Sequence, residues 1–535
     1  MKRYQLILLS LLSAVLLPLA LPNEIFKLGN PLVGLFCLVP YFYAVCRSPS
    51  WKFSLLLGAL FGGLSNALSY YWLMFFAEFA VWTLGGTVFG YILYNSILVL
   101  FLHGFVRTFP RLRVFVLAMI WISYEYLKSI GFLGFPWALM AHPIHSLSPF
   151  IQVADLAGVW GVSLLPVLVN TFLTETLLCW PVLPTKTPGT SLNRRWLAQG
   201  IVVAAIIACA FIYGIIRINI KIPAEKKVSV LLVQQNIDPW REGNRDVSVL
   251  EAMQLSAEGL AAAPAKPDIV IWSETSFQDF VMDFPDRFEQ YPRENPFFPF
   301  IRAENTYFLV GAPKIYNLEK SEVMNATILI TPEGKPVQYY GKQHPVPFAE
   351  ELPFWNWPLA RNFYKAVLGF NNPGWKMGNE YSLFTMKLQD GHQLAFGTPI
   401  CFEDAFPDLN RRFILNGAEL WINLSNVSWS RTESAENQMY VAAKFRAIEN
   451  RRVLIRSTNS GVTSVIDPFG NTLKKLPLFS KNTLAMDVPV YKDKFLTLYT
   501  LAGDYLPLSF LVLLLAGLLL KKTGLLDKLL KSRKK

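Results

Sequence analysis

Charged residues, histidines and cysteines are scarce in this chain. Only 16% of its 535 residues are charged, whereas 53% are hydrophobic, and the mean hydropathy is +0.32. This balance excludes an ordinary soluble enzyme, in which about a quarter of the residues are charged. The five histidines and five cysteines show no clustered metal-ligand spacing, so we expect no metal site. The chain also lacks a glycine-rich phosphate loop and a G-x-G-x-x-G motif, so we expect no nucleotide cofactor and no other cofactor.

The net charge of +12 does not indicate a nucleic-acid partner. Many lysines and arginines lie in short loops between apolar runs and in the C-terminal tail. The globular part shows no basic face interleaved with stacking aromatics, which nucleic-acid binding would require. We therefore predict a lipid bilayer as the partner of the apolar part.

Long apolar runs fill the first 220 residues and recur near the C-terminus. A spanning helix needs about 20 mostly apolar residues. Eight segments meet this need: 5–21, 31–46, 54–75, 85–106, 114–130, 150–178, 197–216 and 498–520. The basic start of the chain could also open a secretory signal, but no small-residue cleavage site is convincing, so we expect a retained helix.

The apolar runs divide the chain into four parts. They are a membrane domain with seven spanning helices (1–220), an extramembrane domain (221–495), an eighth spanning helix (496–520) and a basic tail (521–535). Lysines and arginines gather at both termini and in alternate loops, which places those loops and both termini in the cytoplasm. The extramembrane domain then lies outside, which in a bacterium is the periplasmic face of the inner membrane.

The extramembrane domain alternates short apolar runs with helical segments. Seven runs are typical of buried strands: 228–234, 268–272, 307–311, 326–330, 394–397, 420–424 and 453–456. Helices are expected over 246–263, 437–451 and 404–416. This alternation predicts an α/β domain with a largely buried sheet.

Cys401 is the only cysteine between residues 221 and 495, so a disulfide within this domain is impossible. A lone thiol in an oxidising compartment is a liability unless it is buried or used. Composition alone leaves a buried structural cysteine and a catalytic cysteine equally open.

Three segments favour the catalytic alternative when they are taken together. Glu274 follows a predicted strand, Lys342 precedes a proline-rich loop, and Cys401 ends another strand. A cysteine nucleophile needs a carboxylate base and a cation that stabilises the thiolate. An attacked carbonyl also needs oxyanion donors, which Lys342 and the backbone N–H of Phe402 could supply.

In the order Glu, Lys, Cys, these segments resemble the nitrilase superfamily, whose catalytic domain is an αββα sandwich. Further stretches resemble its strands and loops near the site: 417–426 followed by Trp429, 446–450 and 456–463. The insertion of such a domain before a last spanning helix resembles apolipoprotein N-acyltransferases, the membrane-embedded branch. The resemblance implies transfer of an acyl chain from a membrane phospholipid to the N-terminal diacylglyceryl-cysteine of apolipoproteins. A membrane-tethered amidase of the same superfamily is the alternative.

The resemblance also assigns roles to residues. Glu274 would be the general base, Lys342 the oxyanion-stabilising cation, and Cys401 the nucleophile that carries the acyl thioester. Glu350 would support Lys342, and Glu403 matches the acid of the family's Cys-x-Glu motif. Two positions depart from the family pattern: Phe402 replaces a frequent tyrosine, and Ser273 a frequent proline.

Candidate substrate contacts rest on weaker matches. The resemblance suggests Trp240, Asn426 and Trp429. An aromatic arm, residues 352–370, adds Trp355 and Trp357. Aromatic side chains with a few charges suit the boundary between lipid headgroups and acyl chains. We interpret this arm as a mobile lid that dips towards lipid, with a core-packing insertion as the alternative.

Overall fold

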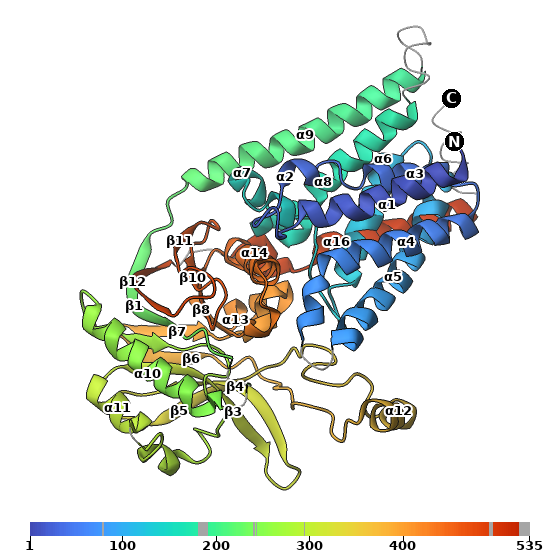
Figure 1. Ribbon diagram of the computed structural model, residues 1–535. Helices are drawn as coiled ribbons and strands as arrows, with labels where there is room; N and C mark the ends of the chain where they lie inside the picture. The colour runs from blue at the N-terminus through green and yellow to red at the C-terminus, as the bar shows by residue number, and fades with distance from the viewer. Residues whose placement is uncertain are drawn as a thin grey trace. The chain divides into compact units, whose positions relative to one another are not determined.

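The computed structural model describes residues 1–76, 80–179, 191–238, 241, 243–293, 295–491 and 496–523. The chain forms two compact units (Figure 1). The helical unit comprises Met1–Ile130, Gly134–Ile220 and Ala502–Lys535, and the α/β unit comprises Gly131–Leu133 and Lys221–Leu501.

The helical unit consists of apolar helices. Its α-helices are α1 (Arg3–Ala20), α2 (Pro31–Gly34), α3 (Val39–Arg47), α4 (Trp51–Ser69), α5 (Ala80–Thr108), α6 (Arg113–Leu127), α7 (Ser148–Ile151), α8 (Ala154–Cys179), α9 (Ser191–Asn219) and α16 (Tyr505–Lys522). Two 3₁₀ turns, η1 (Tyr71–Phe75) and η3 (His142–Ile144), interrupt this series. On α16, exposed leucines and valine make the outer surface apolar, as lipid requires.

Five helices of the described residues are long and apolar enough to cross a membrane: Arg3–Ala20, Val81–Thr108, Ala154–Cys179, Arg194–Asn219 and Tyr505–Lys522. The other three predicted spans are shorter or divided. Segment 31–46 contains the short helices α2 and α3, segment 54–75 passes from α4 into η1, and α6 has 15 residues. The count of eight spans therefore stays a prediction.

The α/β unit contains two six-stranded sheets. The first has the order β12-β1-β2-β3-β4-β5, and the second β11-β10-β9-β8-β7-β6. The strands are β1 (Ala224–Gln234), β2 (Ile269–Ile271), β3 (Tyr307–Asn317), β4 (Glu322–Ile330), β5 (Pro336–Gly341), β6 (Phe384–Lys387), β7 (Gln393–Gly397), β8 (Leu420–Ser425), β9 (Val453–Thr458), β10 (Ser464–Ile466), β11 (Thr472–Lys475) and β12 (Asn482–Tyr491). All seven predicted strands are present.

Helices cover the outer face of each sheet, so the unit has four layers (Figure 1). Helix α10 (Asn244–Ala262) packs on the first sheet, and a core of its apolar side chains with those of β1, β2 and β3 fills the interface. Helices α13 (Pro407–Leu415) and α14 (Glu433–Asn450) pack on the second sheet. The αββα sandwich implied by the nitrilase resemblance is thus confirmed.

Parallel strands at the centre of each sheet direct their carboxyl ends to the site. Strands β1, β2 and β3 are mutually parallel, and so are β7, β8 and β9. Every residue of β2, β8 and β9 is buried, as expected for strands covered on both faces. In open α/β sheets, functional groups gather beyond such carboxyl ends.

Candidate active site

Glu274 lies just beyond the carboxyl end of β2 and is 5% exposed. Its Oε1 accepts a hydrogen bond from Nδ2 of Asn325 (2.8 Å), and its Oε2 accepts one from the backbone N–H of Asn426 (2.8 Å). The backbone at Glu274 can pass close to β3 because residue 311 of that strand is a glycine and has no side chain. A Cβ at Gly311 would lie 2.7 Å from the Cα of Glu274. The carboxylate is therefore fixed from two strands and one loop.

Lys342 follows the last residue of β5 and is 1% exposed. Its Nζ lies 2.7 Å from Oε1 of Glu350 and 3.4 Å from Oε1 of Glu274. The other oxygen of Glu350 accepts the N–H of Val346 at 2.7 Å. Glu350 thus holds the lysine with one oxygen and its own loop with the other, and its supporting role in catalysis stays a prediction.

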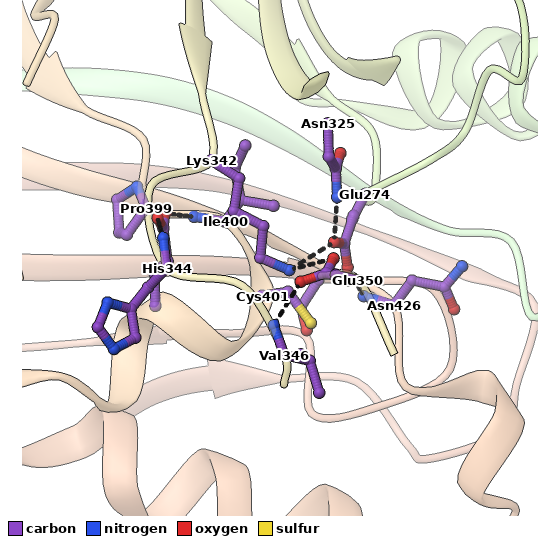
Figure 2. A network of polar contacts seen from close by, with 12 residues as sticks. Glu274, Asn325, Lys342, His344, Val346, Glu350, Pro399, Ile400, Cys401 and Asn426 are labelled. Carbon is purple, nitrogen blue, oxygen red and sulfur yellow. Dashed lines mark hydrogen bonds and ion pairs between the residues drawn. The ribbon is translucent and has the colours of Figure 1, made fainter. Parts of the chain in front are cut away.

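Cys401 begins the 3₁₀ turn η5 (Cys401–Ala405) and has a φ of +52°. Residues other than glycine rarely adopt this left-handed conformation, and such strain is concentrated at functional sites. The turn is anchored because Ile400 bridges Leu424 of β8, and the Asn423 amide donates to the Cys401 carbonyl at 3.2 Å. Figure 2 shows the Cys401 sulfur beside the Glu274, Lys342 and Glu350 groups. The three residues predicted from separate segments are brought together.

Electrostatics set the protonation of this cluster. Burial raises the pKa of the Cys401 thiol, the carboxylates of Glu274 and Glu350 raise it further, and Lys342 lowers it less than they raise it. Burial also raises the pKa of Glu274. Burial opposes the charge of Lys342, but the two carboxylates outweigh it and raise the pKa of its ammonium. The resting site therefore holds a neutral thiol, a charged lysine and a carboxylate able to take the thiol proton.

Glu403 organises the backbone of the site. It is fully buried, and its oxygens accept the N–H groups of Gln343 (2.6 Å), His344 (3.0 Å) and Ile400 (2.7 Å) and the hydroxyl of Tyr340. Burial raises its pKa to about 7. The carboxylate thus joins the segment that follows Lys342 to the turn that carries Cys401, and it holds the two segments in place.

On the expectation from the resemblance that Cys401 carries an acyl thioester, replacing Glu403 with glutamine should slow acylation of Cys401 by about 10- to 100-fold, because an amide NH₂ would face N–H donors that now bond a buried carboxylate. The free energy of unfolding should fall by about 1–3 kcal/mol for the same reason. Single-turnover acylation and thermal unfolding of the purified full chain measure both effects. An E403Q protein that acylates at the wild-type rate would contradict this positioning role.

Two residues that hold Glu274 were not predicted from the sequence as site residues. Asn325 lies in the middle of buried strand β4, donates to Glu274, and accepts the backbone N–H of Lys342 at 2.9 Å. A polar amide between the apolar residues Met324 and Ala326 was the signal available for it. Gly311 left no such signal, because its importance comes from the proximity of the chain at Glu274.

A buried ion pair fixes the far side of the cysteine turn. Asp404 is fully buried and accepts from Nε of Arg456 on β9 at 2.9 Å. Arg446 of α14 donates to the carbonyl of Ala405 at 2.6 Å. Both arginines lie in stretches that resembled the nitrilase superfamily, and both act on the turn that carries Cys401.

Three of the residues predicted to contact substrate or to support the site lie in or near the turns that follow β7 and β8. Asn426 offers its backbone N–H to Glu274, and its side-chain oxygen accepts from Ser428 and Asn459, so it positions the Glu274 carboxylate. Trp429 is half-buried in the turn Ser428–Ser430. The ring of Phe402 packs against Phe406 with centroids 4.9 Å apart.

The remaining candidates lie in the aromatic arm or outside the described residues. Trp355 stacks on Tyr364, and Trp357 packs on Phe354, with centroids 6.2 and 4.8 Å apart. Trp240 lies outside the described residues. Substrate contact by these tryptophans stays a prediction.

Comparisons with known proteins agree with both units. The model of the apolipoprotein N-acyltransferase N-terminal domain matches residues 13–172, and that of the carbon-nitrogen hydrolases matches residues 230–492. The chain is 36% identical to apolipoprotein N-acyltransferase 2 of Treponema denticola over 528 residues, with 96% of each chain covered. It is 36% identical to the enzyme of that name from Treponema pallidum, covering 90% of this chain and 88% of the relative.

A third relative extends the match to another genus. The chain is 32% identical to the apolipoprotein N-acyltransferase of Borreliella burgdorferi, covering 93% of this chain and 92% of the relative. The similarity therefore spans the helical unit and the α/β unit together. With a carbon-nitrogen hydrolase domain in a chain of apolar helices and a buried Glu-Lys-Cys cluster, this protein belongs to the apolipoprotein N-acyltransferase family.

Proposed function

We propose that this enzyme transfers an acyl chain from a membrane phospholipid to the α-amine of the diacylglyceryl-cysteine at the N-terminus of apolipoproteins. The observation that carries the proposal is the convergence of Glu274, Lys342 and Cys401 in a chain that is similar to apolipoprotein N-acyltransferases along nearly its whole length. Apolar helices in the same chain would bring the site to substrates that reside in a bilayer.

In the first half-reaction, Glu274 takes the proton of the Cys401 thiol as the sulfur attacks an ester carbonyl of the phospholipid. The Lys342 ammonium and the Phe402 N–H stabilise the oxyanion, because Lys342 is itself part of the triad and Phe402 directly follows the nucleophile. Glu274 returns the proton to the departing glycerol oxygen. A lysophospholipid leaves, and the acyl chain remains as a thioester on Cys401.

In the second half-reaction, the α-amine of the apolipoprotein attacks the thioester carbonyl. Glu274 accepts a proton of the amine, and the same oxyanion donors act again. The thiol leaves with a proton, and an amide is formed. One site used twice in this way is typical of ping-pong catalysis.

The proposed placement is the bacterial inner membrane, with both termini in the cytoplasm and the α/β unit in the periplasm. The lysines and arginines of alternate short loops support this orientation. Most of the basic tail, residues 524–535, lies outside the described residues.

The aromatic arm fits a lid that contacts lipid. Its helix α12 (Pro358–Leu368) exposes Leu359, Phe363 and Val367 (86%, 48% and 55%), which are spaced four residues apart and so form one stripe. Tyr364, the next residue after Phe363, is buried, and its hydroxyl donates to the Pro353 carbonyl at 3.0 Å. An apolar stripe on a short amphipathic helix is suited to the interface of a bilayer.

Replacing Leu359 and Phe363 together with serine should slow acylation by phospholipid vesicles about tenfold or more, because burying each side chain in lipid is worth about 1.5–3 kcal/mol. Cleavage of a short, water-soluble ester should change little. The exposed Asn362, replaced with serine, is the matched control on the same helix. Equal losses with both esters would contradict the lipid-contacting role.

Transfer and hydrolysis distinguish the proposed function from a membrane-tethered amidase. The acylated full chain, freed of phospholipid, is mixed with a diacylated lipopeptide or with buffer alone. We expect rapid formation of N-acylated lipopeptide and slow release of free fatty acid. Fast hydrolysis without transfer to the amine would contradict the acyltransferase function.

A further inference from the structure

The carboxyl end of β8 serves both reacting groups of the site. The Asn423 amide donates to the Cys401 carbonyl, and the Asn426 N–H donates to Glu274. Between them lies Ser425, the last residue of β8, which is fully buried. Its backbone is fixed because it pairs with Thr458 of β9, and its carbonyl accepts the N–H of Asn459 at 3.0 Å. The Ser425 side chain therefore occupies a rigid position.

Sulfur atoms surround the Ser425 hydroxyl. It donates to Sδ of Met439 at 3.7 Å. Cys401 lies alongside Ser425, because Ile400 bridges Leu424 and because the Asn423 amide, which points to the same face of β8 as Ser425, reaches the Cys401 carbonyl. The Ser425 hydroxyl also lowers the pKa of the Cys401 thiol. Thioethers and neutral thiols are weak acceptors, so this buried hydroxyl has poor partners while the site is at rest.

We propose that Ser425 is a further catalytic residue, whose hydroxyl turns from Sδ of Met439 to donate a hydrogen bond to Sγ of Cys401 and so stabilises the thiolate as it forms. The inference rests on Cys401 being the nucleophile of the proposed function. The thiol proton passes to Glu274, and Ser425 keeps its own proton throughout. The same hydroxyl acts again when the amine displaces the sulfur from the thioester.

The bond contributes to catalysis because it strengthens when charge appears. A hydrogen bond to a neutral thiol is weak, whereas one to a thiolate is charge-assisted and roughly twice as strong as a neutral bond. Only interactions that are stronger in the transition state accelerate the chemistry. Lys342 balances the charge of the thiolate as a whole but already pairs with two carboxylates. Ser425 adds a donor that no carboxylate engages among the described residues.

Alkylation of Cys401 by iodoacetamide tests this without any lipid. The full chain in detergent is alkylated over a range of pH, and peptide mass spectrometry reads Cys401 apart from the other four cysteines. Ser425→Ala removes the hydroxyl. Ser425→Thr keeps it, and Ser425→Val has nearly the same shape as threonine without it. Ser457→Ala removes an equally buried hydroxyl on β9 that donates to the Ile271 carbonyl.

We expect the midpoint of alkylation, which is the pH at which Cys401 reacts at half its maximal rate, to rise by about one unit in S425A. Acylation of S425A by phospholipid vesicles should slow by about 10- to 100-fold. S425T should stay closer to wild type than S425V, and S457A should leave the midpoint unchanged. Wild-type midpoints in S425A, or equal midpoints in the threonine and valine variants, would overturn the proposal. Because alkylation needs no acyl donor, this result stands apart from the acyltransferase function itself.

Discussion

Cells whose only copy of this enzyme carries Cys401→Ala should accumulate diacylated lipoproteins, with no N-acylated form detectable. The reason is chemical: the acyl chain has to be held covalently between two substrates that bind in turn, and alanine offers no nucleophile. The two carboxylates of the same turn, Glu403 and Asp404, already bond the Ile400 N–H and Arg456. The N-terminal peptides of lipoproteins, analysed by mass spectrometry, give the outcome directly.

Cys209→Ala is the matched control for this experiment. Cys209 is an exposed cysteine of helix α9, so its loss tests whether thiols in general matter. The Cys209 variant should give fully N-acylated lipoproteins. Normal acylation in the Cys401 variant would show that the nucleophile has been assigned to the wrong residue.

Glu274→Gln should slow acylation of Cys401 by at least about 100-fold, the lower end of what a general base contributes. The amide cannot accept the thiol proton, and one of its ends would face donors from Asn325 or Asn426 that now bond the carboxylate. Stopped single-turnover reactions with phospholipid vesicles measure the loss. Glu274→Asp keeps a base at a shorter reach and should retain part of the rate.

The pH dependence of the wild-type enzyme gives a second check on Glu274. Burial raises the pKa of this carboxyl, so the proton-accepting form is lost at a higher pH than for an ordinary glutamate. Acylation should therefore decline as the pH falls through that raised pKa and level off above it. A Glu274→Gln protein that keeps both the wild-type rate and this acidic decline would exclude Glu274 as the base.

The central strands were predictable because their apolar runs are continuous. Strands β2, β8 and β9 are buried along their whole length, so their sequences differ clearly from helices and loops. Strands β5, β6, β10, β11 and β12 were not predicted. Strands β5, β6, β11 and β12 are the edge strands and contain exposed residues, so hydrophobic pattern alone does not mark them. Strand β10 is buried but has only three residues.

The same distinction applies to the site. Glu274 and Cys401 stand out because each is a reactive group that follows a predicted strand, Lys342 stands out because it precedes a proline-rich loop, and a family resemblance joins them. Asn325 bonds Glu274 from another strand, and the contact proposed for Ser425 also crosses from β8 to the cysteine turn, so both depend on register rather than on local sequence. Glu403, close to Cys401 in sequence, turned out to bond backbone groups around Lys342, which only the folded chain reveals.

Incubation of the full chain with phospholipid alone tests the central claim most directly. Intact mass spectrometry should show a gain equal to one acyl chain, and peptide mapping should place it on Cys401 as a thioester that hydroxylamine removes. Addition of a diacylated lipopeptide should then return the protein to its original mass. An enzyme that N-acylates the lipopeptide without ever carrying acyl on Cys401 would contradict the account.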